Sequence, residues 1–239
     1  MRIAIVSDIH GNLTAFEAVL ADLERTSPDM ILHGGDLADA GSGSVEIVDQ
    51  VRGLGWKGVA GNTDQMLAMP ETFEIFASKS PRLTHLWNVL REMAAVTREL
   101  LGEERLAWLR NLPLVHIMPP IAVVHASPED PWSAPTLQAT DEELSSRYSS
   151  LTQPIVVYGH IHQPFVRTIG TLTVANSGSV GLPYDGDRRA GYLLIDDLRI
   201  EIRRVEYDLA KELLTLRSSG IPHAEWVART LESGSPQMP

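Results

Sequence analysis

The sequence predicts an α/β fold. Within residues 1–64, short apolar runs rich in β-branched residues alternate with stretches in which apolar residues recur at helical spacing. This βαβαβ order is typical of a parallel sheet. In the second half of the chain, five strand-like runs follow one another closely, which favours antiparallel pairing. The 239 residues are enough for one domain with a large core.

The first half of the chain has clear element boundaries. A strand is expected at Arg2–Ser7, and the following helix carries a capping-box spacing at Thr14 and Glu17. The next elements are a strand at Met30–His33, a helix at Val45–Val51 and a strand at Trp56–Ala60. Residues 66–112 lack strand signals and space their apolar residues as a helix does. We therefore expect a helical insertion there.

The second half is predicted to be mostly strands. Two runs, Leu114–Met118 and Ile121–His125, are separated by two prolines, and a second capping-box spacing follows at Thr140 and Glu143. The later strands are expected at Ile155–Tyr158, Phe165–Ile169, Leu172–Ala175, Gly191–Asp196 and Ile200–Tyr207. Helices at Leu209–Arg217 and His223–Leu231 close a single domain of residues 1–231. Residues 232–239 are expected to form a frayed tail.

Composition excludes several classes of protein. Apolar residues make up 44% of the chain and charged residues 21%, and no apolar run is long enough to span a membrane. The first strand begins at Arg2, so we expect no signal peptide. The absence of cysteine excludes disulfides and thiolate metal ligands and fits a cytoplasmic protein. A net charge of −11 opposes nonspecific binding to nucleic acid or to anionic membranes.

Seven polar residues follow predicted strands at their C-terminal ends. They are Asp8, His10, Asp36, Asn62, His125, His160 and His162. In open α/β sheets this edge is where ligands bind, so the seven donors are expected to converge on one crevice. Carboxylate, amide and imidazole donors without thiolate suit Mn, Fe, Zn or Co. Because His160 and His162 are two residues apart, both can point to the same side of an extended segment and approach a pair of metal ions.

Each of these residues also has an ordinary structural interpretation. A lone His125 after an apolar strand is more often a satisfied core histidine, and a lone Asp8 is more often a helix cap. Seven such residues, each shortly after an apolar strand, favour a shared metal site over seven unrelated structural roles.

Five separated motifs resemble those of a known family. Asp8-Ile9-His10, Gly35-Asp36, Gly61-Asn62-Thr63-Asp64, His125 and Gly159-His160-Ile161-His162 are similar, in order, to the motifs of calcineurin-like metallophosphoesterases. The resemblance covers about residues 2–207. The segments 125–128 and 176–181 look like the small YfcE-like branch of these enzymes. The resemblance implies a four-layer α/β/β/α sandwich, two mixed sheets between helical layers, with a dinuclear metal centre.

The resemblance also implies a role for each motif residue. Asp8, His10, Asp36 and His162 would bind one ion, and Asp36, Asn62, His125 and His160 the other. Asp36 would bridge the ions, and Asn62 would also steady a phosphate oxygen during catalysis. The cofactor would be two divalent ions, with Mn²⁺ expected in vitro and Fe, Zn, Co or Ni as alternatives.

The chain departs from the family at Thr63. Many members have a histidine after the motif asparagine, which is thought to protonate the leaving group. A threonine hydroxyl cannot act as a general acid near neutral pH, so reactions that need this acid are in doubt. Two cations can still activate water and stabilise charge on a phosphoryl group.

Other positions keep more than one interpretation. His33 is either a partner of the metal ligands, or the missing acid, or a space-filling histidine; Asp64 either orients a histidine ligand or is a turn residue. Arg188, Arg189 and Thr63 could contact substrate, although the arginines could instead pair with Asp185 and Asp187. Residues 176–181 could form a backbone cradle for phosphate or an ordinary turn.

The sequence thus predicts a metal-dependent phosphoester hydrolase. A phosphodiester or nucleotide-type substrate is favoured, a dinucleoside polyphosphate or a phosphoprotein remains open, and the oligomeric state is left open. The alternative from another class is a non-catalytic protein-binding scaffold on the same fold. The presence of every ligand residue argues against a scaffold.

Overall fold

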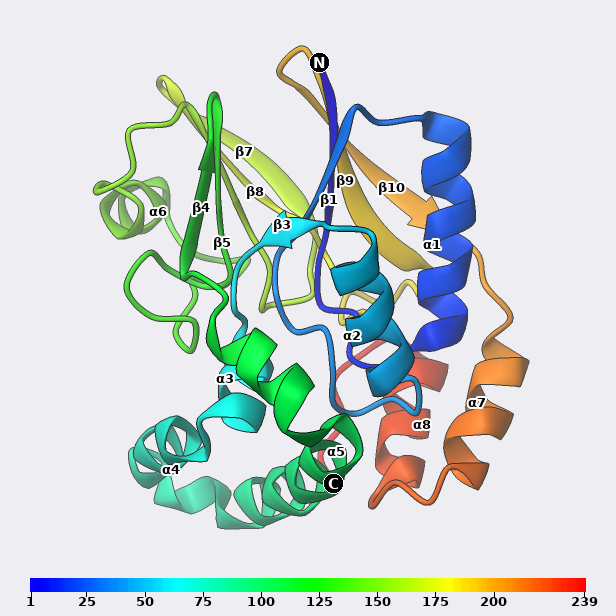
Figure 1. The fold of residues 1–239 in the computed structure, drawn as a ribbon. Coiled ribbons are helices and arrows are strands. Elements are labelled where there is room, and N and C mark those ends of the chain that lie inside the picture. Colours follow the sequence, from blue (N-terminus) through cyan, green and yellow to red (C-terminus); the bar gives the residue numbers. More distant parts are fainter.

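Two five-stranded sheets form the centre of the molecule. The computed structural model describes residues 1–239. The first sheet has the strand order β10-β9-β1-β2-β3 and the second β4-β5-β6-β8-β7 (Figure 1). The strands are β1 (Arg2–Val6), β2 (Met30–His33), β3 (Lys57–Gly58), β4 (Val115–Met118), β5 (Ile121–Val124), β6 (Ile155–Tyr158), β7 (Phe165–Ile169), β8 (Leu172–Asn176), β9 (Ala190–Asp196) and β10 (Arg199–Val205).

The sheets pack face to face between layers of helices. Along β1, Ile3 and Ile5 face the second sheet, whereas Ala4 and Val6 pack against helices. This alternation follows from the two-residue period of a strand. The outer face of the second sheet is covered by α6 (Asp141–Arg147) through Leu144. The predicted four-layer α/β/β/α sandwich is confirmed.

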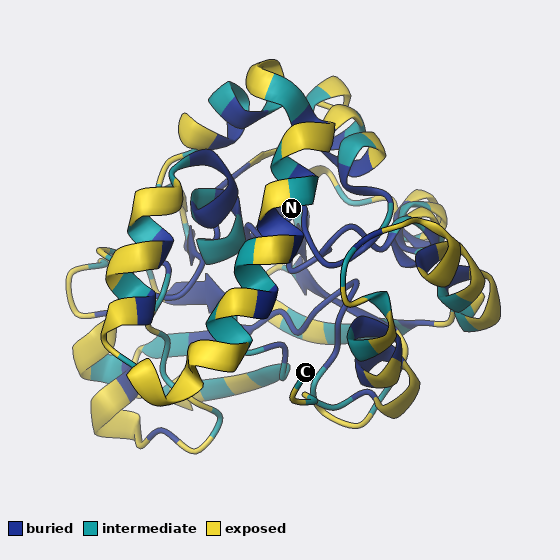
Figure 2. Ribbon diagram, turned by 90° about the horizontal axis from the view of Figure 1, so that it is seen from below, coloured by how far each residue is buried: buried dark blue, intermediate teal, exposed yellow.

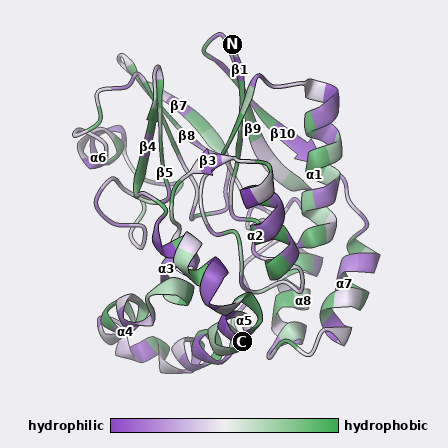
Figure 3. Cartoon of the chain, in the orientation of Figure 1, coloured by the Kyte–Doolittle hydropathy of each residue, from purple (hydrophilic) through white to green (hydrophobic).

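Helices cover the outer face of the first sheet and one end of both sheets. The face is covered by α1 (Leu13–Thr26) and α2 (Ser44–Gly53), and the end by α3 (Asn62–Ala68), α4 (Pro70–Ser78), α5 (Thr84–Arg110), α7 (Leu209–Ser218) and α8 (Ala224–Ser233). These helices turn their buried, hydrophobic faces inward and expose their polar faces (Figures 2 and 3). None of them is long and apolar enough to cross a membrane.

The predicted helical insertion and tail can be located in this structure. Residues 66–112 lie in α3, α4, a 3₁₀ turn at Pro81–Leu83 and α5, and α3 already begins at Asn62. The tail expected from Glu232 begins inside α8. Trp226 Nε1 donates to the Gln237 carbonyl at 2.8 Å and links the tail to this helix.

The predicted cap of the first helix is wrong. The N-cap is Asn12, whose side chain accepts a hydrogen bond from Ala15 N at 3.0 Å. Thr14 lies inside the helix, because asparagine is a stronger cap than threonine and stands two residues earlier. At Thr140 the prediction holds: Thr140 Oγ1 accepts from Glu143 N, and Glu143 Oε2 accepts from Thr140 N at 2.7 Å.

The antiparallel pairing predicted for the late strands is only partly correct. β7 with β8 and β9 with β10 are antiparallel, but β6 is parallel to both β5 and β8. The β7–β8 hairpin places β7 at the sheet edge and returns β8 beside β6. The fully buried run Ile155–Tyr158 is typical of such a central parallel strand, whereas the burial of β7 alternates.

Candidate metal centre

The seven predicted ligand residues lie on loops at one edge of the two sheets. Asp8 and His10 follow β1, Asp36 follows β2, and Asn62 opens α3 after β3. His125 follows β5, and His160 with His162 follows β6. Each loop therefore leaves the C-terminal end of a parallel strand, and the two sheets together bring all seven side chains to one place.

The loops hold several of these residues in a rare backbone conformation. Asp8, His10, Asp36, His160 and His162 have φ values between 48° and 66°, in the left-handed region. Non-glycine residues adopt this region at a cost of about 1 kcal/mol or more, and such residues cluster at functional sites. The strain indicates that the surrounding structure positions these side chains.

Two glycines allow the loops to approach each other closely. A Cβ on Gly61 would collide with the carboxylate of Asp36, and a Cβ on Gly159 would collide with that of Asp8. The glycines of the Gly61-Asn62 and Gly159-His160 motifs are therefore needed for close packing of the donors.

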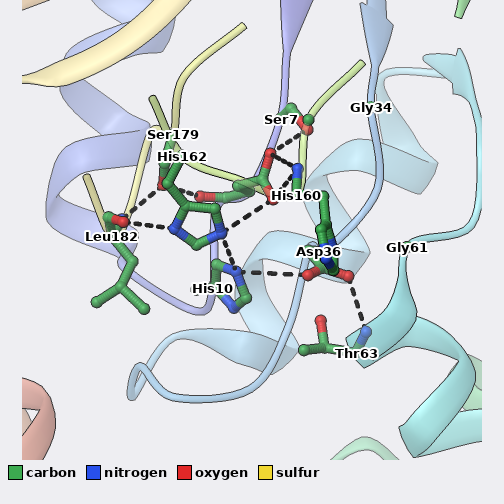
Figure 4. A network of polar contacts seen from close by, with 12 residues as sticks. Ser7, His10, Gly34, Asp36, Gly61, Thr63, His160, His162, Ser179 and Leu182 are labelled. Atoms are coloured by element: carbon green, nitrogen blue, oxygen red, sulfur yellow. Dashed lines mark hydrogen bonds and ion pairs between the residues drawn. The ribbon is translucent and has the colours of Figure 1, made fainter. Parts of the chain in front are cut away.

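The first group of donors is compact and fully buried. Ligand atoms of Asp8, His10, Asp36 and His162 all lie within 4.8 Å of one another. His10 Nε2 and His162 Nε2 face each other at 3.2 Å (Figure 4). His162 Nε2 also lies 3.1 Å from Asp8 Oδ1.

The second group adjoins the first through Asp36. Asn62 Oδ1 lies 2.9 Å from His125 Nε2 and 2.7 Å from His160 Nδ1. Asp36 Oδ2 lies 3.5 Å from His10 Nε2 and 3.4 Å from His125 Nε2. Asp36 is thus the side chain shared by both groups, the position expected of a bridging ligand.

Backbone carbonyls orient two of the histidines. Nδ1–H of His162 donates to the Leu182 carbonyl at 2.5 Å, and Nδ1–H of His125 donates to the Gly34 carbonyl at 2.8 Å. These bonds direct each Nε2 toward the other donors. Histidine ligands of metals typically donate their other ring N–H in this way.

The charges of the centre are strongly coupled. Burial alone would raise the pKa of Asp36, but His125 and His10 hold it well below its usual range. Burial would lower the pKa of His125, but Asp36 raises it to about 10. Burial lowers the pKa of His10 and of His160 to about 4. In the metal-free protein the positive charge of protonated His125 therefore offsets the negative charge of Asp36. A cation bound beside these two residues would displace the proton from His125.

The first donor group fits a divalent cation, because its nitrogen and oxygen ligand atoms face one another. The second group brings Asn62, His125 and His160 together beside it, and the Gly34 and Leu182 carbonyls hold the Nδ1–H of His125 and His162 away from the centre. Asp8, His10, Asp36 and His162 could hold one ion, and Asp36, Asn62, His125 and His160 the other. When bound, such a pair activates water and stabilises charge on a phosphoryl group.

Asp64 holds the loops of the centre together. Its carboxylate accepts hydrogen bonds from Asp36 N at 2.8 Å, Leu37 N at 3.1 Å and Gly61 N at 2.9 Å. Burial, followed by the charge of Asp36, raises the pKa of Asp64 to about 6. It makes no hydrogen bond to a histidine ligand, so its role is to fix the backbone on either side of Asp36 and just before Asn62.

The glycine-rich segment 176–181 also supports the loops. Ser179 Oγ donates to the Asp8 carbonyl at 2.7 Å, Gly181 N to the same carbonyl at 3.0 Å, and Val180 N to the Ser7 carbonyl at 3.0 Å. These donors are already engaged. Of the two interpretations that the sequence left open, this favours an ordinary turn over a phosphate cradle, and the segment fixes the loop that carries Asp8 and His10.

A cavity of about 260 Å³ opens above the donors. His10, Asp36, Asn62, His160 and His162 form its floor. Residues of α4, α5 and α8, with Trp132 and Tyr184, form its walls, and 12 of its 20 lining residues are hydrophobic. The ring of Tyr184 stacks on His162 with the centroids 4.3 Å apart.

Thr63 lies in this cavity, whereas His33 does not. Thr63 N donates to Asp36 Oδ1 at 2.8 Å, and its buried hydroxyl has no hydrogen-bond partner. His33 packs against Trp108 with both ring nitrogens unpaired, and burial lowers its pKa to about 3. Its position fits the space-filling interpretation and gives no support to the missing acid.

The structure does not bring the two predicted substrate arginines to the centre. Arg188 and Arg189 line a separate surface depression with Asp185, Asp187 and Glu206. Arg189 pairs with Asp187 at 2.6 Å, which is the alternative that the sequence left open.

Sequence reasoning missed Asp39 and the aromatic residues of the cavity. Asp39 lines the cavity in the loop after β2, and its Oδ1 accepts from Thr97 Oγ1 at 2.9 Å. Burial raises the pKa of Asp39 to about 6. The only sequence signal was a second aspartate three residues after Asp36. The aromatic residues resemble ordinary core residues in sequence, because core and cavity walls share the same helical spacing.

Comparison with known proteins decides the family. The model of the calcineurin-like phosphoesterase superfamily domain matches residues 1–197. This chain belongs to the calcineurin-like phosphoesterase superfamily. The superfamily predicted from the five motifs is confirmed, and the chain is accordingly a phosphoric ester hydrolase.

Relatives of this phosphoesterase fall into two groups. An uncharacterised protein of Methanocaldococcus jannaschii is 31% identical over 97% of this chain and 98% of its own length. A symmetrical bis(5'-nucleosyl)-tetraphosphatase of Methylococcus capsulatus is 32% identical, over 61% of this chain and 50% of that protein. The chain thus spans about half the length of the tetraphosphatases that it matches.

Solved structures match the phosphoesterase along its whole length. A metallophosphoesterase from Sphaerobacter thermophilus has a TM-score of 0.80 and 29% identity, covering 98% of this chain and 100% of its own. A hypothetical protein from Pyrococcus horikoshii has a TM-score of 0.84 over 99% of both chains. Because its sequence identity is only 20%, this similarity supports the fold and nothing further.

Proposed function

We propose that this protein is a divalent-metal-dependent phosphodiesterase that acts on small, nucleotide-type substrates in the cytoplasm. The observation that carries the proposal is the convergence of seven nitrogen and oxygen donors from both sheets around Asp36. Hard and borderline divalent cations such as Mn²⁺ suit these donors.

The protein residues have separate tasks in this proposal. Asp36 neutralises part of the charge of two adjacent cations, and Asn62 holds one cation and steadies a phosphoryl oxygen. Thr63 replaces the usual histidine at the cavity floor and cannot supply a proton near neutral pH. Substrates whose leaving group departs as a stable anion, such as an aryloxide or a phosphate, are therefore favoured over alkyl esters.

A second candidate is the hydrolysis of dinucleoside polyphosphates. The similarity to symmetrical bis(5'-nucleosyl)-tetraphosphatases over about half of their length favours it. The lining of the cavity argues against dinucleoside polyphosphates as substrates, because it contains no lysine or arginine to pair with the charges of a polyphosphate chain. A protein-binding scaffold would not need a complete set of buried, oriented donors.

The proposal is tested with the Mn²⁺-reconstituted protein and three substrates: bis(p-nitrophenyl) phosphate, p-nitrophenyl phosphate and diadenosine tetraphosphate. We expect the diester to be hydrolysed with the highest kcat/KM, and the activity to disappear with a chelator and return with Mn²⁺. No turnover of any of the three would overturn the enzymatic function. A preference for the tetraphosphate would favour the second candidate.

A further inference from the structure

Four aromatic rings form one wall of the cavity above the metal centre. Phe76 and Trp132 stack with their centroids 4.9 Å apart, and Phe73 lies 6.1 Å from Trp132. Trp87 packs edge-on against both phenylalanines, at 6.0 Å and 5.8 Å. The rings come from α4, α5 and the loop after β5, so three separate segments contribute to a single aromatic surface.

The polar atoms of the tryptophans are not available to a ligand. Trp132 Nε1 donates to Gln65 Oε1 at 3.0 Å, and Trp87 Nε1 donates to the Ser80 carbonyl at 2.8 Å. Trp226, on the α8 side of the cavity, donates its Nε1–H to the Gln237 carbonyl at 2.8 Å. What these side chains can offer a ligand is therefore carbon surface and ring faces.

The walls of the cavity carry no positive charge. Arg91 stacks its guanidinium on Phe73 at 5.4 Å and pairs with Glu74 at 2.6 Å, but it does not line the cavity. The acidic residues that line it are Asp36 at the centre and Asp39. Negative charges of a ligand beyond the reacting phosphoryl group would lie against apolar walls without a partner, which is costly.

We propose that this cavity binds an uncharged, planar aromatic group of a phosphodiester monoanion, and that it selects such substrates against polyphosphates. The inference rests on the proposed function and narrows its substrate class. The phosphodiester group lies over Asn62 and His160, and its aromatic substituent, of nucleobase size, contacts Trp132 and Phe76. The volume of about 260 Å³ suits one such group, because pockets for larger ligands span about 300–1,000 Å³.

The test measures binding separately from turnover. Methylphenylphosphinate and ethylmethylphosphinate are both monoanions whose two substituents are attached through P–C bonds, so neither has an ester bond to hydrolyse, and they differ in the aromatic ring. Titration calorimetry on the Mn²⁺-loaded protein should give a dissociation constant about tenfold lower for the phenyl compound, since stacking on one aromatic side chain typically has this effect.

Variants locate the effect in the cavity. Trp132→Leu should reduce the phenyl-to-ethyl affinity ratio toward one. Trp56→Leu is the matched control, because Trp56 packs on Phe16 away from the cavity, with centroids 5.7 Å apart, and this variant should keep the wild-type ratio. If Trp132→Leu does not fold, as judged by circular dichroism, Phe76→Leu takes its place.

The possible outcomes are distinct. Equal affinities for the two phosphinates, or a ratio that survives removal of the aromatic wall in a folded variant, would overturn the inference and leave the proposed function standing. A protein that hydrolyses no phosphoester but shows a high phenyl-to-ethyl affinity ratio, lost on removal of the aromatic wall, would support the aromatic binding site. The same result would overturn the proposed function. Higher kcat/KM for diadenosine tetraphosphate than for bis(p-nitrophenyl) phosphate would overturn the selection against polyphosphates.

Discussion

At the scale of single residues, the centre depends on side chains that are positioned by backbone contacts. The Leu182 and Gly34 carbonyls set the orientation of His162 and His125, and Asp64 fixes the backbone on either side of Asp36 and just before Asn62. Such contacts between distant segments cannot be read from sequence spacing. The residue types at strand ends could be predicted, because the motifs and the strand pattern agreed. Their partners could not.

Asp36 should matter far more than His33. At saturating Mn²⁺, Asp36→Asn should lower kcat/KM by more than about 100-fold, because it removes charge from the position between two cations. His33→Ala should have a smaller effect on kcat/KM, since both ring nitrogens of His33 lack partners and the ring only packs against Trp108. Steady-state kinetics on both folded variants checks the ranking. Similar losses would contradict it.

Thr63 should determine how strongly the reaction depends on the leaving group. Wild-type rates should fall steeply as the leaving alcohol becomes more basic. Thr63→His should raise turnover of alkyl esters by on the order of 10²-fold or more and leave p-nitrophenyl esters nearly unchanged. A leaving-group series on both proteins, at equal metal content, measures this. A flat wild-type dependence with chemistry rate-limiting would show that another group supplies the proton, and Asp39 in the cavity would be the next candidate.

Asp39 should make the metal-free protein less stable above about pH 6 than at pH 4. Its pKa rises from 3.8 to about 6, so the folded state holds this proton more tightly than the unfolded state. Stability from this group therefore falls as pH rises from about 4 to about 6, and the loss reaches about 3 kcal/mol at most above that window. In a chelator, Asp39→Asn should raise the Tm at pH 8 and not at pH 4. An equal change at both pH values would rule out titration of Asp39 as the cause.

At the scale of elements, the strand ends position the donors and the helices position the cavity. Strand ends were predictable because β-branched runs stop abruptly at polar motifs. Pairing of β6 was predicted wrongly because short spacing suggested hairpins, whereas among the five late strands only β7–β8 and β9–β10 form them. The start of α1 was predicted wrongly because two cap signals, Asn12 and Thr14, lie within three residues. The helical insertion was predicted, but the sequence could not distinguish its core residues from those that line the cavity.

The wall that α5 contributes should set the preference for charge. Leu90→Lys places a cation in the cavity and should raise kcat/KM for diadenosine tetraphosphate relative to bis(p-nitrophenyl) phosphate, by about tenfold at low salt and less at high salt. The control is Leu100→Lys, on the exposed side of the same helix and outside the cavity, which should keep the wild-type ratio. An unchanged ratio in a folded Leu90→Lys protein would contradict the role of this wall.

At the scale of the molecule, the two sheets meet at the centre. The first sheet supplies Asp8, His10, Asp36 and Asn62, and the second supplies His125, His160 and His162. Each of the two proposed ion sites draws ligands from both sheets, so bound ions would link the halves of the sandwich. The family, the layers and the strand-end positions followed from the sequence. The cavity did not, because it depends on how α4, α5, α8 and the loop after β5 pack over the sheet edge.

Metal content tests the central claim most directly. The wild-type protein, reconstituted with Mn²⁺ and freed of unbound metal by gel filtration, should contain close to two ions per chain by elemental analysis. Asn62→Ala should retain close to one, because Asn62 lies in only one of the two donor groups. Two ions in the wild type and fewer in the variant would support a dinuclear centre built around Asp36. A wild-type protein that binds one ion or none would contradict it.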